Sequence, residues 1–558
     1  MITKEDIRNA GSVLDRYRSS KASIEKRVIE NRRLWRRLTG SVADDKTDRE
    51  TYIHTAWMFN MLAGRHADAV DAYPEAIISG REEGDAPKAK ILSEILPLIC
   101  EQNGYEELWS ELWWSKLIDG TCITGVFFDN SLCRGLGDIS LRPIDLLSLY
   151  WEPGITDIQK SRNVFSVESF LNEELYEKYP FLEGKLSGDK FSVYQSEYED
   201  ASGSEERSSV IDWYYKRRGK LHYCKFVGDE ILYASENDRR FSERGWYDHG
   251  MYPFVFDSMY PYSKGICGFG YVDVCKNPQK YIDKLNSAVM RNALALSRAR
   301  YFVRSDGGVN EKEFADVSNE LIHVSSSALG EDSIRQIENH PLSAVYTNVL
   351  QMKIDEMKET VGNREFNQGG TYGGVVSGTA IAALQEAGSK ISRDIISSSY
   401  RAFEKVNYLM IELIRQFYTV PRAFRILGKE GTQEFIHFDN SLLKRGDGGK
   451  IYGLESVLSE PIFDIKVFAQ KASPFSREVR NERAMQFYKS GFFNPEMREQ
   501  ALAAIEMMDF DGREKIQKVI GGIQSHAEAP LPLSAPEKAN VLYSAAEKYD
   551  AQRKKLRH

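Results

Sequence analysis

The forty residues from Thr379 to Tyr418 carry apolar side chains at helical spacing from one end to the other. The repeating positions are Leu384, Ile391, Ile395, Ala402, Val406, Leu413 and Phe417. Because an α-helix rises 1.5 Å per residue, a helix of this length spans about 60 Å, which is more than a small domain needs. We therefore predict one long helix over 379–418, shared between neighbouring subunits of an assembly.

Two further helical patterns precede this helix and bracket about forty residues of strand and turn character. The first follows GICGFG (265–270), with Asn277 as the expected N-cap and Pro278 at the first helical position. The second starts at HPLSAVYTNVL and ends at Val361. The intervening stretch is longer than the usual connection between packed elements. The pattern predicts an antiparallel helical hairpin with a small domain at its far end.

A glycine-rich loop joins the second of these helices to the long helix. Its candidate contact residues are Asn367, Gln368, Gly369, Gly370, Thr371, Tyr372, Gly373 and Gly374. Glycine makes such a loop adaptable, and its polar side chains can hydrogen bond or stack without fixed charge. The loop lacks the Lys that precedes Ser or Thr in a phosphate-binding Walker loop, and its glycine spacing does not fit a dinucleotide fingerprint. This composition suits a polymer that moves past the loop.

The N-terminal third is expected to begin with helices. Residues 4–39 have an amphipathic pattern with an expected break near Ser19–Ser20, and two more helical stretches lie around 53–71 and 86–119. From Gly125 onward the period becomes that of short strands.

The β-rich part continues to residue 233. Residues 208–233 predict three strands joined by turns at Arg218-Gly219 and Gly228-Asp229. The acidic, Ser- and Gly-rich stretch 195–209 is expected to be an exposed insertion. Further strands are expected in 421–439 and 462–470, followed by a helical tail.

Composition limits the possible partners and chemistry. The formal net charge of -8 disfavours tight binding of nucleic acid over a broad surface, so any DNA contact should be local, weak or sliding. Six cysteines form no CxxC pair, and the histidines are scattered, so we expect no metal, no cofactor and no catalytic residue. No signal peptide and no apolar window of about 18 residues is present, so no membrane partner is expected.

The order of these elements and several local sequences resemble the portal proteins of tailed bacteriophages. The similar segments cover nearly the whole chain, and their joint order is more specific than any single motif. Examples are ENRRLWRRLTG (30–40), LIDGTCITGVFFD (117–129), GFGYVDVCKNPQKYIDKLNSAVMRNAL (268–294) and SGTAIAALQEAGSKISRD (377–394).

The resemblance implies an α+β portal fold assembled as a ring. It has a mixed α/β wing, a helical-hairpin stem, a small α/β clip, a long wing helix and a helical crown. Carried over to this chain, the regions are the wing at 1–262 and 419–476, the stem helices at 263–298 and 341–362, the clip at 299–340, the channel loop at 363–378, the long wing helix at 379–418, and the crown with the C-terminal tail at 477–558.

The resemblance also implies a function. Portal proteins form a homododecameric ring at one capsid vertex of the virion, after assembly in the host cytoplasm. Double-stranded DNA passes through the ring during genome packaging and ejection. The expected partners are the terminase large subunit, which is the packaging ATPase, at the clip, the major capsid and scaffolding proteins at the wing, and later the head-completion or adaptor proteins. The chain itself is expected to be structural rather than an enzyme.

A shallow basic band on the first stem helix is a second candidate DNA contact. It comprises Lys276, Lys280, Lys284 and Arg291. The alternative is that these side chains are solvated or form ion pairs between subunits.

Two other functions stay open from the sequence. One is a different head–tail connector or adaptor ring, although adaptors are generally smaller. The other is a nucleotide-binding enzyme that uses Gly369–Gly378, which the missing lysine disfavours.

Overall fold

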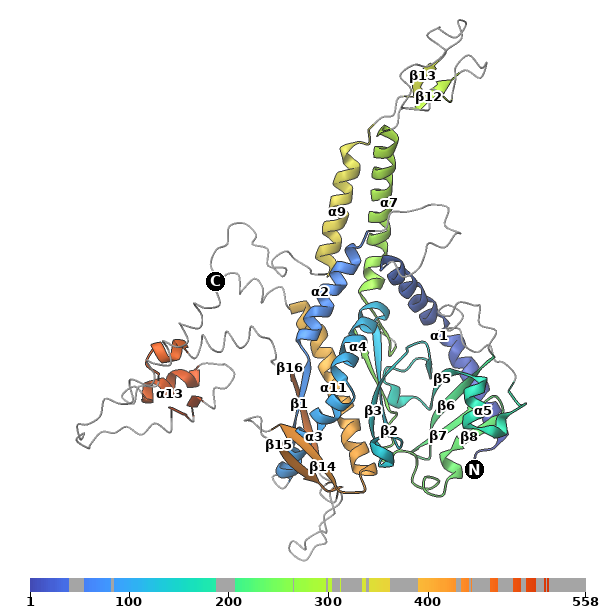
Figure 1. Ribbon diagram of the computed structural model, residues 1–558, viewed down its shortest axis with the longest axis vertical. Helices are drawn as coiled ribbons and strands as arrows, with labels where there is room; N and C mark the ends of the chain where they lie inside the picture. The colour runs from blue at the N-terminus through green and yellow to red at the C-terminus, as the bar shows by residue number, and fades with distance from the viewer. Residues whose placement is uncertain are drawn as a thin grey trace, which may run out of the picture. The chain divides into compact units, whose positions relative to one another are not determined.

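Helices and antiparallel strands are mixed along the chain, in agreement with the expected α+β class (Figure 1). The chain divides into two compact units, Met1–Gln470 and Lys471–His558. The computed structural model describes residues 1–39, 55–81, 85–186, 206–263, 265–297, 300–303, 312, 334–337, 341–361, 390–427, 433–440, 443, 462–469, 485–492, 498–507, 516–517 and 519–520. Across these residues, every helix is too short or too polar to span a bilayer.

Helix α1 (Lys4–Leu38) begins at a capping box, in which Thr3 and Asp6 satisfy each other's backbone N–H groups. The expected break near Ser19–Ser20 is wrong, because α1 is continuous. The Ser19 hydroxyl donates to the carbonyl of Asp15 at 2.9 Å, within the helix, so this serine does not interrupt it.

The first half of α1 lies on a five-stranded antiparallel sheet with strand order β4-β5-β6-β7-β8. Tyr17 of α1 packs edge-on against Phe165 of the sheet, with ring centroids 6.0 Å apart. The strands are β4 (Leu149–Trp151), β5 (Asn163–Leu171), β6 (Arg207–Arg217), β7 (Lys220–Val227) and β8 (Glu230–Ala234).

The three strands predicted within 208–233 are confirmed as β6, β7 and β8. Their first turn places Arg218 and Gly219 at φ of 54° and 76°, which a two-residue hairpin of this type requires. Residues 195–205 lie outside the described part of the chain. The end of the predicted insertion does not fit that prediction, because Ser208 and Ser209 are buried in β6.

A second, three-stranded sheet has the order β3-β2-β9 and packs with several helices in the largest core. The single helical stretch expected at 86–119 is two helices, because the chain turns at Gly104 with a φ of 60°. The elements are α2 (Trp57–Asp71), α3 (Ala86–Gln102), α4 (Tyr105–Asp119), β2 (Thr121–Asp129), β3 (Asp138–Ile144) and β9 (Phe254–Ser258).

Strand β1 (Pro74–Gly80) is among the strands that were not expected from the sequence. It pairs antiparallel with β16 (Phe463–Ala469), which follows almost 400 residues later. A segment that precedes the predicted hairpin and a segment that follows the long helix therefore belong to one sheet. A second ribbon, β14 (Arg422–Leu427) with β15 (Gln433–Phe438), follows the long helix and agrees with the strands expected in 421–439.

The predicted hairpin is present as α7 (Tyr271–Ser297) and α9 (Ala344–Val361), which lie side by side and run in opposite directions (Figure 1). The antiparallel strands β12 (Arg300–Val303) and β13 (Ile334–Ile337) pair at its far end. The predicted start at Asn277 is wrong. Helix α7 begins at Tyr271, and Asp273 accepts a hydrogen bond from the Gly270 N–H at 3.1 Å, the cap expected of a helix start.

The long helix is described as α11 (Lys390–Phe417), which agrees with the predicted end near Tyr418. Residues 379–389 of the prediction lie outside the described part. Ile395, Phe403, Val406 and Met410 of α11 are buried in the main core. In the second unit, α13 (Arg498–Met507) contributes Ala501 and Ile505 to a small cluster of its own with Ile520.

The remaining elements are short. They are α5 (Asn172–Lys178), β10 (Tyr260–Pro261), β11 (Gly268–Phe269) and the 3-10 turns η2 (Cys133–Gly135), η3 (Ile158–Lys160), η4 (Pro180–Leu182) and η5 (Ser235–Asn237).

Candidate functional site

The candidate loop Asn367–Gly374, with the whole range 363–378, lies outside the described residues. Both helices that lead to it are described, since α9 ends at Val361 and α11 is described from Lys390. Of the expected clip at 299–340, the structure describes β12, β13 and residue 312. The candidate site is therefore described from the hairpin and from its contacts with helices α1, α2 and α4.

The four candidate cations on α7 divide into two pairs. The ammonium groups of Lys276 and Lys280 each lie 3.3 Å from a carboxylate oxygen of Glu30 on α1. Partial burial tends to raise the pKa of Glu30, but the two lysines outweigh this effect and leave it below its ordinary value. Lys284 and Arg291 are exposed further along the hairpin. For Lys276 and Lys280 the geometry favours the ion-pair alternative, with a partner in the same chain.

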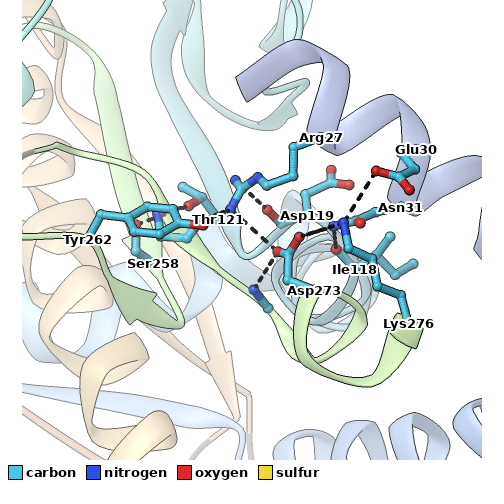
Figure 2. Close-up of polar contacts among 12 residues, drawn as sticks. Arg27, Glu30, Asn31, Ile118, Asp119, Thr121, Ser258, Tyr262, Asp273 and Lys276 are labelled. Carbon is cyan, nitrogen blue, oxygen red and sulfur yellow. Dashed lines mark hydrogen bonds and ion pairs between the residues drawn. The ribbon is translucent and has the colours of Figure 1, made fainter. Parts of the chain in front are cut away.

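A polar network joins α1 to the start of α7 (Figure 2). We call it the base network and define it as Arg27, Glu30, Asn31, Asp273 and Lys276. One Arg27 nitrogen donates to the Gly268 carbonyl at 2.7 Å and reaches Asp273 at 3.4 Å. The Asn31 amide donates to Asp273 at 2.9 Å. The network therefore fixes the direction in which the hairpin leaves the body.

The C-terminal end of α4 enters the same network. Arg27 donates to the carbonyl of Asp119 at 3.2 Å, and Asn31 donates to the carbonyl of Ile118 at 3.1 Å. These carbonyls have no partner within their own helix, and a positive charge beside them is favourable. Arg32, one residue beyond Asn31, holds the Asp119 carboxylate with both Nε (2.9 Å) and Nη2. Helices α1, α4 and α7 thus meet at one joint.

Glycines allow this joint to close. Gly120 has a φ of 82°, and a Cβ placed there would lie 2.5 Å from the Phe269 carbonyl carbon. A Cβ at Gly270 would lie 2.6 Å from the Leu117 carbonyl oxygen. A Cβ at Gly268 would lie 2.3 Å from the Tyr260 carbonyl oxygen. Gly268 and Gly270 of GICGFG are therefore needed for close backbone packing, whereas a Cβ at Gly265 would meet nothing within 4 Å.

Further along α7, two buried side chains cap the start of α2. Gln279 accepts from the Met58 N–H at 3.0 Å, and Asp283 accepts from the Thr55 N–H at 3.0 Å. Helix α2 has no side-chain cap of its own at Ala56, so α7 supplies the missing acceptors. These residues could not be predicted from the sequence, since a cap supplied from more than 200 residues away leaves no local signal.

The hairpin also exposes apolar side chains. Tyr281 and Leu294 on α7, and Val345 and Met352 on α9, are each more than half exposed in the single chain. Apolar side chains gathered on a projecting element mark a surface for protein contact.

The described residues include no group of three or more His, Cys, Asp or Glu side chains close enough to hold a metal ion. Cys100 and Cys275 are buried, and burial raises the pKa of each thiol to about 12. Asp129 and Asp145 accept hydrogen bonds from the backbone N–H groups of Ser131 and Leu147, two residues further along the chain, as is typical of turn residues.

Comparison with protein-family models matches residues 68–556 to a family described as Phage P22-like portal protein. The match covers more than half of the chain and includes the hairpin, the long helix and most of both units. A search of curated proteins found no match.

Proposed function

The chain belongs to the Phage P22-like portal protein family, and from this premise we propose that it forms a dodecameric ring at one vertex of the phage capsid. The family is one of structural proteins, and membership implies a ring assembly in the phage capsid that works with DNA and packaging proteins. The ring would be the channel through which the genome is packaged and later ejected. The family match over 68–556 is the observation that carries this proposal.

The hairpin of α7 and α9 is assigned to the stem and residues 367–374 to the channel wall. The exposed apolar side chains of the hairpin support this assignment, because neighbouring subunits of a ring would cover them. The uncharged composition of Asn367–Gly374 supports contact with DNA that does not retain it. Strong binding of phosphates by a ring of lysines or arginines would impose friction on a moving duplex.

The charge distribution agrees with weak contact. The chain carries a net charge of -8, so the walls of a ring would repel DNA over most of their surface. Lys276 and Lys280 are paired with Glu30, and we therefore assign the shallow basic band to Lys284 and Arg291. These two exposed cations are the stem residues we expect to contribute to the salt dependence of DNA passage.

The partners follow from the regions. We assign the packaging ATPase, the terminase large subunit, to the clip at 299–340, and the head-completion or adaptor proteins to the same surface after packaging. The wing at 1–262 and 419–476 would meet the major capsid and scaffolding proteins. The ring itself is expected to show no DNA-stimulated ATP hydrolysis, which a purified sample can test directly.

Deletion of residues 367–374 tests the loop. Rings should assemble with an unchanged subunit number by native mass spectrometry, while heads assembled with the variant should retain less DNA. The control is deletion of eight residues within the acidic stretch 195–205, which the proposal places away from the channel. Heads that fill equally well with both deletions would show that the loop has no part in DNA retention.

A further inference from the structure

Helix α2 holds a buried arginine at the point where the hairpin and the long helix meet the body. Arg65 is 6% exposed. Its Nη2 donates to the carbonyl of Val361 at 2.6 Å, and its Nε donates to the same oxygen at 3.2 Å. Val361 is the last residue of α9. The guanidinium therefore caps the end of the helix that leads into the 362–389 segment.

The same guanidinium reaches the beginning of the long helix. Its Nη1 donates to the hydroxyl of Ser392, in the first described turn of α11. Asp68, one turn further along α2, accepts from Arg65 at 3.2 Å and from Ser392 at 3.0 Å. We call these four residues, Arg65, Asp68, Val361 and Ser392, the Arg65 cluster. The cluster brings together Val361 and Ser392, which are 31 positions apart in the sequence.

The chemistry of arginine suits this position. Its planar guanidinium offers donors in several directions at once, whereas the lysine ammonium is a compact point charge. A positive charge beside the last carbonyls of α9 is favourable, because those carbonyls carry the negative end of the helix dipole. Asp68 balances the charge of the buried guanidinium, which would otherwise be costly.

Packing around the cluster reinforces it. Met357 and Val361 of α9 are fully buried, and the ammonium group of Lys358 lies 5.6 Å from the ring centroid of Trp57 at the start of α2. Figure 1 shows the lower end of α9 and the upper end of α11 next to α2. Helix α2 is in turn capped by Gln279 and Asp283 of α7. Helix α2 therefore contacts α7, α9 and α11.

We propose that Arg65, balanced by Asp68, is a positioning residue that sets where the chain leaves α9 and where it enters α11. This inference rests on the proposed function, because the segment between these two points contains the residues assigned to the channel. We assign Arg65 no direct contact with DNA or with residues 367–374. It acts through Val361 and Ser392, and it fixes both ends of the segment to the same helix.

The test measures the distance between the two helices. Spin labels at Met352→Cys on α9 and Asp394→Cys on α11, in a Cys133→Ser background that removes the exposed native thiol, report this distance by pulsed electron resonance. Labelled subunits are diluted with unlabelled ones in the ring. Arg65→Gln should turn a single narrow distance distribution into a broad one. Arg8→Gln, which removes an exposed arginine paired with Asp229, is the control and should change nothing.

Two further variants keep the proposal testable if Arg65→Gln does not fold. Arg65→Lys retains the charge but cannot reach both helix ends, so it should also broaden the distribution. Ser392→Ala removes only the contact with α11 and should do the same to a smaller degree. Distributions identical to the control in all three variants would overturn the proposal.

DNA retention in assembled heads separates this inference from the proposed function. A broadened distance with reduced retention supports both. A broadened distance with normal retention supports the positioning role of Arg65 and counts against the channel role of residues 367–374.

Discussion

At the residue scale, Lys116 is a fully buried cation that links three elements of the described chain. Its ammonium group lies 2.8 Å from a carboxylate oxygen of Asp257 on β9 and donates to the Ser399 hydroxyl of α11 at 2.7 Å. Asp257 also accepts from the hydroxyls of Ser398 and Ser399. This arrangement ties α4, β9 and the long helix together inside the core.

We expect Lys116→Met to destabilise the subunit by about 3–5 kcal/mol, because the Asp257 carboxylate would remain buried without its partner. Urea unfolding followed by tryptophan fluorescence measures the loss. The double variant Lys116→Met with Asp257→Asn removes both charges and should recover a large part of the stability. A single variant that is no less stable than the double variant would contradict this explanation.

A second residue-scale prediction concerns acid. Burial, with a smaller contribution from Lys216, lowers the pKa of His249 to about 4. In the unfolded chain this imidazole takes up a proton below about pH 6.5, while the folded chain keeps it neutral. The stability contributed by neutral His249 is therefore complete above pH 6.5 and is lost as the pH falls toward 4, by on the order of 3 kcal/mol.

In the native chain, His249 Nδ1 accepts a hydrogen bond from the Met251 N–H at 3.0 Å. The substitution His249→Asn retains an acceptor for this hydrogen bond. The variant should have a flatter dependence of unfolding free energy on pH between 6.5 and 4 than the native chain. Chemical denaturation at several pH values in this range compares the two slopes. Equal slopes would mean that His249 does not contribute to the acid sensitivity.

At the scale of the element, the joint between α4 and α7 depends on glycine. Gly270→Ala would place a methyl group 2.6 Å from the Leu117 carbonyl oxygen, so the backbones of the two helices must separate. We expect a loss of about 1–3 kcal/mol, as for other overpacked sites. Thermal unfolding of the subunit measures this loss.

Gly11→Ala provides the matched control for this substitution. Gly11 lies in α1, and a Cβ there meets nothing within 4 Å. Alanine has the higher helix propensity, so this variant should be as stable as the native chain or up to about 1 kcal/mol more stable. Equal effects at the two positions would mean that close backbone approach is not what requires Gly270.

At the scale of the whole molecule, the exposed apolar surface of the hairpin predicts how the subunit assembles. Tyr281→Ser combined with Leu294→Ser should leave the melting temperature of the isolated subunit unchanged, since both side chains are more than half exposed. The same change should reduce the fraction of protein in rings, because the neighbouring subunit would lose apolar contact area. Native mass spectrometry measures this fraction.

Leu136→Ser is the matched control for the ring prediction. Leu136 is as exposed as Tyr281, at 58%, but it lies in the turn between β2 and β3 rather than on the hairpin. Ring formation should be normal in this variant. If the control and the double variant assembled to the same extent, the hairpin surface would have no special role in assembly.

Much of the architecture could be predicted from the sequence because it depends on local periodicity. The hairpin helices, the end of the long helix near Phe417 and the three strands from Arg207 to Ala234 follow from the spacing of apolar residues and from turn residues such as Gly219. The portal family could be inferred as well, because it rests on the order of such elements along the chain.

Other features depend on which surfaces meet, and only the tertiary structure decided them. The pairing of β1 with β16, the Glu30 partner of Lys276 and Lys280, and the joint that requires Gly270 each join segments that are distant in sequence. The contacts of Arg65 with Val361 and Ser392 are of the same kind. A sequence pattern reports the neighbours of a residue along one helix or strand, whereas these interactions arise only when separate elements pack together.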